Sequence, residues 1–244
     1  MQLDGMIFDL DGTLTDTFAV CFAAFREALL AFTNRSFTDE EILARFGPSE
    51  DGMFQRWVPD RWEACLRMYL ASYEREHRRL ARVFPGIETA LDALQARRIP
   101  LAVVTGKGAQ SAAISLAQLG LGRYFDTVET GSPEGGVKPR CLRRVLTHWG
   151  VTPDRVAYLG DVPSDIEASR AVGVIPLAAA WEKRSDAAAL RALEPLAAFD
   201  TVAQFIEWVE RTVEPRLDAP RNPDPSRGGA ANCRRGGAQG DGCR

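Results

Sequence analysis

The chain has 244 residues, of which 45% are hydrophobic and 26% are charged, and its net charge at pH 7 is -3. This composition is ordinary for a globular protein, and the length suits one large domain or one domain with an insertion. The small negative charge does not favour binding to nucleic acid or to a membrane surface, and no apolar run is long enough to cross a bilayer. We therefore expect neither kind of partner, and the first residues do not have the pattern of a signal peptide.

The five cysteines are an odd number, lie scattered along the chain and form no Cys-x-x-Cys pair. This spacing argues against a disulfide framework and against a zinc site. A reducing cytoplasm is therefore the expected compartment.

Residues 3–8 are expected to form a short buried strand that ends at Asp9-Leu10-Asp11-Gly12-Thr13. Asp9 and Asp11 then point to the same side, and Gly12 permits a sharp turn. Neighbouring carboxylates repel, so one must hold a proton or a cation must lie between them. A calcium-binding EF-hand loop is excluded because Gly12 is the fourth residue instead of the sixth, and Val20 stands where a Glu is needed. The segment predicts a catalytic or metal-binding site.

Residues 15–84 are expected to form an all-helical insertion. Thr38 and Glu41 suit a capping box, a further helix is expected over about 62–80, and no strand pattern interrupts the region. Five apolar residues recur at helical spacing near its start, where they indicate core packing: Phe18, Phe22, Phe25, Leu29 and Phe32.

The rest of the chain alternates between strand and helix patterns, which is typical of an α/β fold with a parallel sheet and helices on both faces. Residues 1–14 and 85–214 would form this core. Residues 215–244 are rich in Pro, Gly and Arg and would form a disordered tail. Strands are expected over 99–104, 125–129, 156–159 and 174–178, with helices between them and a closing helix around Phe205 and Trp208.

Three further strand ends carry polar residues. Thr105-Gly106 offers a hydroxyl and backbone N–H groups beside a helix start, where a phosphate could bind. Pro139 fixes Lys138 at a helix entry, although a surface lysine would be the ordinary interpretation of Lys138 alone. Asp161 ends a strand, and Asp165 can face the same side across the first helical turn. Carboxylates gathered in this way favour Mg2+ together with a substrate phosphate.

This ordered set resembles the haloacid dehalogenase superfamily, and specifically its phosphoglycolate phosphatase-like members with a small helical cap. Asp9 to Thr13 match the DxDGT motif, and Val103 to Thr105 match an apolar strand that ends in Thr or Ser. Lys138 matches the third motif, and Gly160 to Asp165 match GDxxxD. The helical insertion between the first two motifs implies the small type of cap.

The resemblance implies a Rossmann-like parallel sheet in the strand order 5-4-1-2-3. It also implies that Asp9 is the nucleophile and Asp11 the general acid and base, with catalytic roles for Thr105 and Lys138. Phosphate binding is implied for Thr105, Gly106 and Lys138. Metal binding is implied for Asp9, the Asp11 carbonyl and Asp161, with Asp165 as a direct or indirect support.

A Mg2+-dependent phosphatase acting on a small phosphomonoester, such as phosphoglycolate, through an aspartyl-phosphate is the function that this resemblance favours. The expected partner is a small phosphorylated metabolite, and the chain would be a monomer or homodimer. A phosphomutase of the β-phosphoglucomutase type and an inorganic pyrophosphatase are alternatives on the same scaffold. A signalling domain phosphorylated on aspartate is disfavoured, because Asp11 would speed loss of the phosphoryl group.

The insertion contains no Lys, which argues against the Schiff-base chemistry of phosphonoacetaldehyde cleavage. Arg45, the segment from Gly47 to Glu50, Arg56 and Trp57 are candidates for the substrate-facing surface of the cap.

Overall fold

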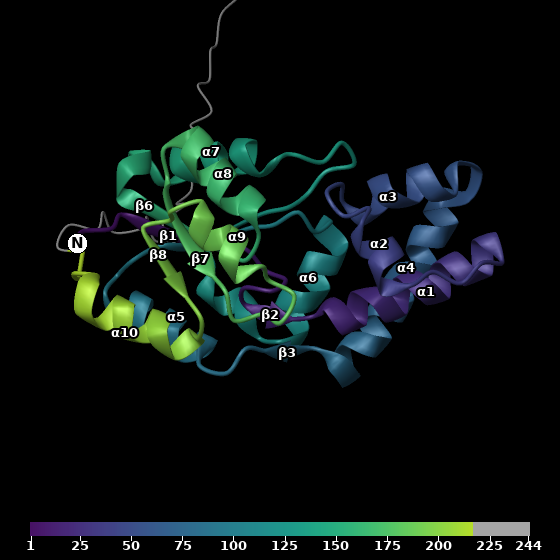
Figure 1. Cartoon of the computed structure of the whole chain (residues 1–244), viewed down its shortest axis with the longest axis horizontal. Helices are drawn as coiled ribbons and strands as arrows, with labels where there is room; N and C mark the ends of the chain where they lie inside the picture. Colours follow the sequence, from purple (N-terminus) through teal and green to yellow (C-terminus); the bar gives the residue numbers. More distant parts are fainter. Residues whose placement is uncertain (217–244) are drawn as a thin grey trace, which may run out of the picture.

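The computed structural model describes residues 1–216. A central sheet of six parallel strands has the order β5-β4-β1-β6-β7-β8 (Figure 1). The predicted order 5-4-1-2-3 counts the five expected strands along the chain, which are β1, β4, β5, β6 and β7 here. It therefore corresponds to β7-β6-β1-β4-β5 and is confirmed. Strand β8 is an additional edge strand that the sequence pattern does not predict. The strands are β1 (Gly5–Phe8), β4 (Leu101–Val104), β5 (Thr127–Glu129), β6 (Val156–Gly160), β7 (Ile175–Ala179) and β8 (Ala197–Phe199).

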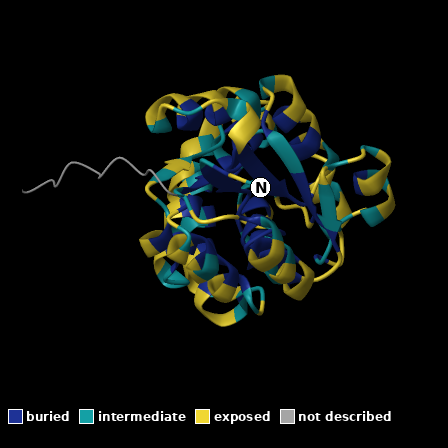
Figure 2. Ribbon diagram, turned by 90° about the vertical axis from the view of Figure 1, so that its left-hand side faces the viewer, coloured by how far each residue is buried: buried dark blue, intermediate teal, exposed yellow. Residues whose placement is uncertain are grey.

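Helices cover both faces of this sheet, so the central strands β1, β4 and β6 are fully buried, whereas the edge strands β5 and β8 are partly exposed (Figure 2). Successive strand residues face opposite layers: Phe8 packs with α5, α6 and α10, whereas Ile7 packs with α7 and α8. Burial on both faces explains the nearly continuous apolar strands. The helices are α5 (Ile87–Ala96), α6 (Ala109–Gln118), α7 (Lys138–Trp149), α8 (Pro163–Val172), α9 (Ala187–Ala192) and α10 (Val202–Thr212).

The inserted segment forms a helical cap at the right of Figure 1, with an apolar core of its own. The rings of Phe25 and Tyr69 lie 4.5 Å apart at their centroids in this core. The predicted capping box of Thr38 and Glu41 is confirmed. The cap helices are α1 (Phe18–Thr33), α2 (Asp39–Leu43), α3 (Glu50–Trp57) and α4 (Trp62–Leu80), and the sequence pattern does not predict α3.

Two short antiparallel strands, β2 (Thr15–Asp16) and β3 (Arg82–Val83), join the cap to the core. The expectation that no strand interrupts residues 15–84 is therefore wrong. Each strand has only two residues, too few to show an alternating apolar pattern. They pair because the chain leaves and re-enters the core at neighbouring points, where Phe84 N–H donates to the Leu14 carbonyl at 3.1 Å.

Three single-turn 3-10 helices span Pro59–Arg61, Leu121–Tyr124 and Pro153–Arg155.

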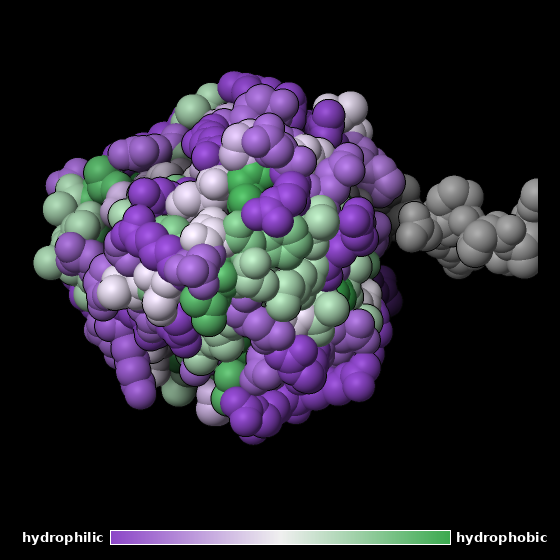
Figure 3. All heavy atoms as spheres, turned by 90° about the vertical axis from the view of Figure 1, so that its right-hand side faces the viewer, coloured by the Kyte–Doolittle hydropathy of each residue, from purple (hydrophilic) through white to green (hydrophobic). Residues whose placement is uncertain are grey.

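Within residues 1–216, no helix combines the length and apolar character needed to cross a membrane. The cap end of the molecule has a mostly hydrophilic surface with an apolar patch (Figure 3). Of the predicted tail, Arg216 packs against the core, where its N–H donates to the Arg97 carbonyl at 2.9 Å. Residues 217–244 of that tail lie outside the described residues.

Candidate active site

The carboxyl ends of three adjacent strands carry the predicted site residues. Strand β1 lies between β4 and β6, so Asp9, Thr105 and Asp161 follow neighbouring strand ends. Lys138 begins α7, and Asp165 lies in the first turn of α8. In an open parallel sheet, this edge is where ligands bind. The topology therefore gathers residues that are far apart in the sequence.

Three buried carboxylates form an acidic cluster at this edge. Asp9, Asp161 and Asp165 each offer an oxygen atom, and these atoms lie within 4.8 Å of one another. Burial raises the pKa of Asp9 to about 6 against the opposing effect of Lys138. Burial, followed by the charge of Asp9, raises the pKa of Asp161 well above its usual value. The cluster carries more negative charge than one lysine balances, which suits a hard divalent cation.

Lys138 is placed between two of these carboxylates. Its ammonium lies 2.8 Å from Asp9 Oδ2 and forms a second ion pair with Asp165. Burial would lower the pKa of Lys138, but the charges of Asp165 and Asp9 raise it, so the ammonium stays protonated. Asp165 is itself held by the Val162 N–H at 3.2 Å and lies 3.0 Å from the Tyr158 hydroxyl. Asp165 therefore orients Lys138 toward Asp9.

Gly12 and Thr13 hold the third acid in place. A Cβ atom on Gly12 would lie 2.2 Å from Asp161 Oδ2, and the φ angle of Gly12 is +83°. Only glycine suits this position. The Thr13 hydroxyl donates to Asp161 Oδ1 at 3.2 Å. The turn after β1 therefore both presents Asp9 and positions Asp161.

The Asp11 carboxylate faces away from the acidic cluster and toward the cap. Its Oδ2 lies 3.1 Å from Lys107 Nζ, and its Oδ1 accepts a hydrogen bond from the Thr17 hydroxyl. The two acids of the DxD sequence therefore have different surroundings. A metal contact through the Asp11 main-chain carbonyl stays a prediction.

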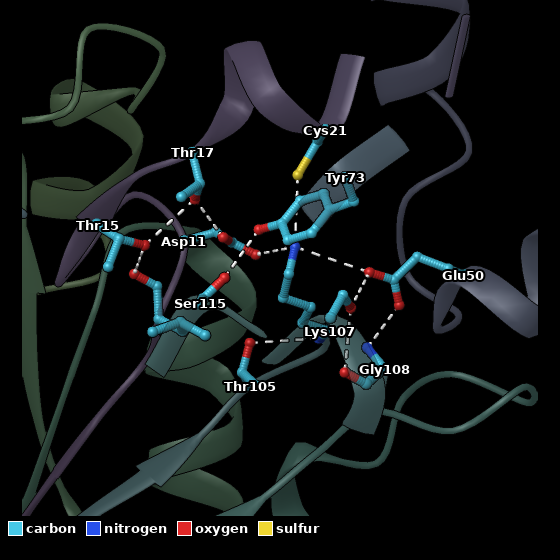
Figure 4. Close-up of polar contacts among 12 residues, drawn as sticks. Asp11, Thr15, Thr17, Cys21, Glu50, Tyr73, Thr105, Lys107, Gly108 and Ser115 are labelled. Atoms are coloured by element: carbon cyan, nitrogen blue, oxygen red, sulfur yellow. Dashed lines mark hydrogen bonds and ion pairs between the residues drawn. The ribbon is translucent and has the colours of Figure 1, made fainter. Parts of the chain in front are cut away.

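Lys107 is a site residue that the sequence interpretation missed. Its side chain is only 3% exposed, and its ammonium lies 3.4 Å from Cys21 Sγ and 4.4 Å from the centre of the Tyr73 ring (Figure 4). Burial would lower the pKa of Lys107, but the charge of Asp11 helps to raise it well above its usual value. Its place two residues after Thr105 was the only available signal, because its partners come from distant segments.

Glu50 connects the cap to the core at the same point. This cap residue accepts hydrogen bonds from the Gly108 N–H at 2.6 Å and the Ser111 hydroxyl at 2.5 Å, and it lies 3.7 Å from Lys107 Nζ (Figure 4). Gly108 and Ser111 belong to the start of α6, where a carboxylate is favoured by the helix dipole. The predicted cap segment from Gly47 to Glu50 thus contains a core contact.

A cavity of about 670 Å3 lies between the core and the cap. Asp165 supports the cavity from behind Lys138 and is not part of its lining. Arg45 packs on the Trp57 ring, and neither of these cap candidates, nor Arg56, lines the cavity. The other predicted site residues line the core side: Asp9, Asp11, Thr105, Gly106, Lys138 and Asp161.

The chain is similar in sequence to curated phosphohydrolases. It is 28% identical over 183 residues to pyrophosphatase PpaX of Oceanobacillus iheyensis, covering 74% of this chain and 85% of that protein. It is also 28% identical over 181 residues to phosphoglycolate phosphatase 1 of Pseudomonas aeruginosa, covering 69% of this chain and 66% of that protein.

Solved structures share the fold. A protein of Haemophilus somnus described as a predicted phosphoglycolate phosphatase superposes with a TM-score of 0.74 at 21% identity, covering 85% of this chain and 98% of that one. CbbY of Rhodobacter sphaeroides, in complex with phosphate, superposes with a TM-score of 0.70 at 19% identity, covering 83% of this chain and 96% of that one.

The model of the family described as haloacid dehalogenase-like hydrolase matches residues 6–179, which is more than half of the sequence. The chain therefore belongs to the haloacid dehalogenase-like hydrolase family.

Proposed function

We propose that the protein is a Mg2+-dependent phosphatase that hydrolyses a small phosphate monoester through an aspartyl-phosphate on Asp9. The observation that carries this proposal is the position of Asp9 on the cavity lining, with Lys138 2.8 Å from its carboxylate and a second acid, Asp11, also on the lining. Relatives named pyrophosphatase and phosphoglycolate phosphatase support a phosphoryl group as the common element of the substrate.

The donor set fits Mg2+. Carboxylate and carbonyl oxygens are its preferred protein ligands, and the acidic cluster supplies them from a buried position. Asp9, Asp161 and the Asp11 carbonyl would hold the ion, with Asp165 in support. When bound, Mg2+ would neutralise charge on the phosphoryl oxygens.

In the proposed first step, an Asp9 carboxylate oxygen attacks phosphorus while the bond to the leaving oxygen breaks. Asp11 donates a proton to that leaving oxygen, which departs as an alcohol. In the second step, Asp11 takes a proton from water as the water oxygen attacks phosphorus and the bond to Asp9 breaks. The products are inorganic phosphate and a regenerated Asp9 carboxylate.

The other side chains orient and balance charge. Lys138 reduces the repulsion between Asp9 and an incoming phosphate, and the Thr105 hydroxyl and the N–H groups after it bind phosphoryl oxygens. Lys107 holds the Asp11 carboxylate at 3.1 Å, so this acid keeps a fixed direction before it donates its proton. Glu50 joins Lys107 only when the cap lies against α6, which links cap closure to the acid.

Phosphate release from a panel of monoesters and from pyrophosphate, with Mg2+ and with a chelator, tests the proposal. We expect Mg2+-dependent turnover of monoesters and labelling of Asp9 when the phosphoenzyme is trapped. A preference for pyrophosphate would favour the function of the PpaX relatives, and transfer of the phosphoryl group to a sugar would favour a phosphomutase. A phosphoenzyme that persists for minutes would contradict a phosphatase.

A further inference from the structure

The cap side of the cavity is an apolar wall. It consists largely of large hydrophobic side chains from the cap, together with Gly47 and Pro48. Phe46 stacks within 6.5 Å of Phe18 and Phe22, so the wall rests on the aromatic core of the cap. The side chains of this wall are Phe18, Phe25, Leu43, Phe46 and Met53.

Three large apolar side chains around the cavity are open to water. Leu43 and Phe46 of the wall are 41% and 38% exposed, and Val162 on the core side is 36% exposed. All three line the cavity, and they make up half of the large hydrophobic residues that are exposed in residues 1–216. Large apolar side chains left open to water around a cavity indicate an apolar ligand surface.

The charged residues of the lining offer no free cation for a second anionic group. Lys138 is paired with Asp9 and Asp165, and buried Lys107 is paired with Asp11 and Glu50. Within the described chain, no Arg or Lys of the cap contributes to the lining. The charged lining residues are five acids and two lysines: Asp9, Asp11, Glu50, Asp161, Glu167, Lys107 and Lys138.

The arginines near this wall are already engaged. Arg45 packs 5.3 Å from the centre of the Trp57 ring and donates to the Glu41 carbonyl at 2.9 Å. Arg184 packs on Phe18 at 5.6 Å and lies 3.4 Å from Glu182. Neither is part of the cavity lining. A carboxylate or second phosphate on the leaving group would therefore meet apolar rings and other acids.

Building on the proposed function, we propose that the leaving group is an uncharged, largely apolar alcohol or phenol. The phosphoryl group would bind at the acidic cluster and Lys138, and the organic part would pack against the apolar wall. Substrates with a second anionic group, such as phosphoglycolate or pyrophosphate, would then be poor ones, because like charges placed together oppose binding.

Matched ester pairs test this inference with the full-length protein and Mg2+. One pair is phenyl phosphate and 4-carboxyphenyl phosphate, and the other is butyl phosphate and 4-phosphooxybutanoate. We expect kcat/KM to be at least about tenfold higher for the neutral member of each pair. The carboxyl group makes the phenol a slightly better leaving group, so the chemistry alone would favour the opposite order. Titration calorimetry of the Asp9→Asn protein should give the same preference in binding.

A cation added to the wall should weaken or abolish the preference for the neutral member of each pair. Leu43→Arg should raise kcat/KM for the carboxylated esters by about tenfold. Leu30→Arg is the matched control, because Leu30 is a 51% exposed cap residue outside the cavity lining. Leu30→Arg should leave both members of each pair unchanged.

The outcomes separate the inference from the proposed function. Equal turnover of both members of a pair, or preference for the carboxylated one, would overturn the inference while the protein remains a phosphatase. Discrimination in Leu43→Arg as strong as in the unmodified protein would also contradict it. If none of the four esters releases phosphate with Mg2+, the proposed function fails, and the inference fails with it.

Discussion

The core and the cap meet at one cavity but differ in the forces that shape it. On the core side, strand ends and helix starts hold charged groups, and each lysine is paired with two carboxylates. On the cap side, aromatic and aliphatic side chains form a wall with one charged residue, Glu50. The core thus provides fixed electrostatics for a phosphoryl group, and the cap provides shape and apolar surface for the remainder of the substrate.

Replacing the proposed nucleophile gives the largest expected effect. Asp9→Asn should lower kcat by roughly a thousandfold or more, because the amide cannot form the acyl phosphate. Steady-state phosphate release measures this loss. The melting temperature without metal serves as the folding control. It should not fall, since the change removes a buried negative charge. Turnover near the original rate would show that the core side of the comparison is wrong.

Removing the buried lysine tests whether the two sides depend on each other. Lys107→Met leaves Asp11 and Glu50 without their shared cation and should lower the free energy of unfolding by about 3 kcal/mol. It should also lower kcat, because Asp11 loses its orientation. Urea unfolding checks the first effect. The exposed Lys183→Met should change stability by less than about 0.5 kcal/mol, and equal effects of the two variants would contradict the role of Lys107.

The pH dependence of stability tests the acidic cluster of the core separately from the cap. The pKa of Asp9 is about 6 in the fold and 3.8 without perturbation, and that of Asp161 is also raised. These raised values favour folding at low pH, so without metal that stability is lost as pH rises from about 4 through about 6. Mg2+ binding requires the deprotonated acids and should strengthen over the same interval.

Melting temperatures from pH 4.5 to 7.5, with Mg2+ and with a chelator, check this expectation. The difference in Tm between the two conditions should grow as the pH rises. Asp9→Asn should reduce that growth. A difference independent of pH would contradict metal binding at the acidic cluster.

The smallest effect is expected for the charge of the cap residue that contacts α6. Glu50→Gln keeps an acceptor for the Gly108 N–H but removes the attraction to Lys107 and the helix start, at a cost of about 1 kcal/mol in stability. Because the cap seats less firmly, kcat/KM should fall by several-fold. Glu63→Gln, at an exposed cap position, is the matched control. Equal kcat/KM for both variants would show that Glu50 does not link the two sides.

The core could be predicted because its information is local. Asp9 and Asp161 follow buried strands directly, and the alternation of strands with helices indicates a parallel sheet. The order of its strands came from the family resemblance and not from the alternation. Strand β8 was missed because Ala197-Ala198-Phe199 lacks a β-branched residue, and α3 was missed because Gly52 interrupts a short helix with little apolar pattern. These elements depend on tertiary packing.

The cap contacts could not be predicted for a different reason. Glu50 and Lys107 lie on separate segments, and each alone is an ordinary charged residue in the sequence. Only the contact of Glu50, at the start of α3, with the start of α6 gives them a shared environment. Within the apolar wall, Phe18 and Phe25 have the helical spacing of a core face. The fold alone shows that Leu43 and Phe46 are left open to water.

The two-stranded connection between cap and core has a mechanical consequence. Thr17 follows β2 by one residue, and its hydroxyl donates to the carboxylate proposed to transfer protons. A swing of the cap on this ribbon would pivot beside that hydrogen bond. Opening and closing of the cap would thus change the hydrogen bond to Asp11 at the pivot, whether or not a substrate is bound in the cavity.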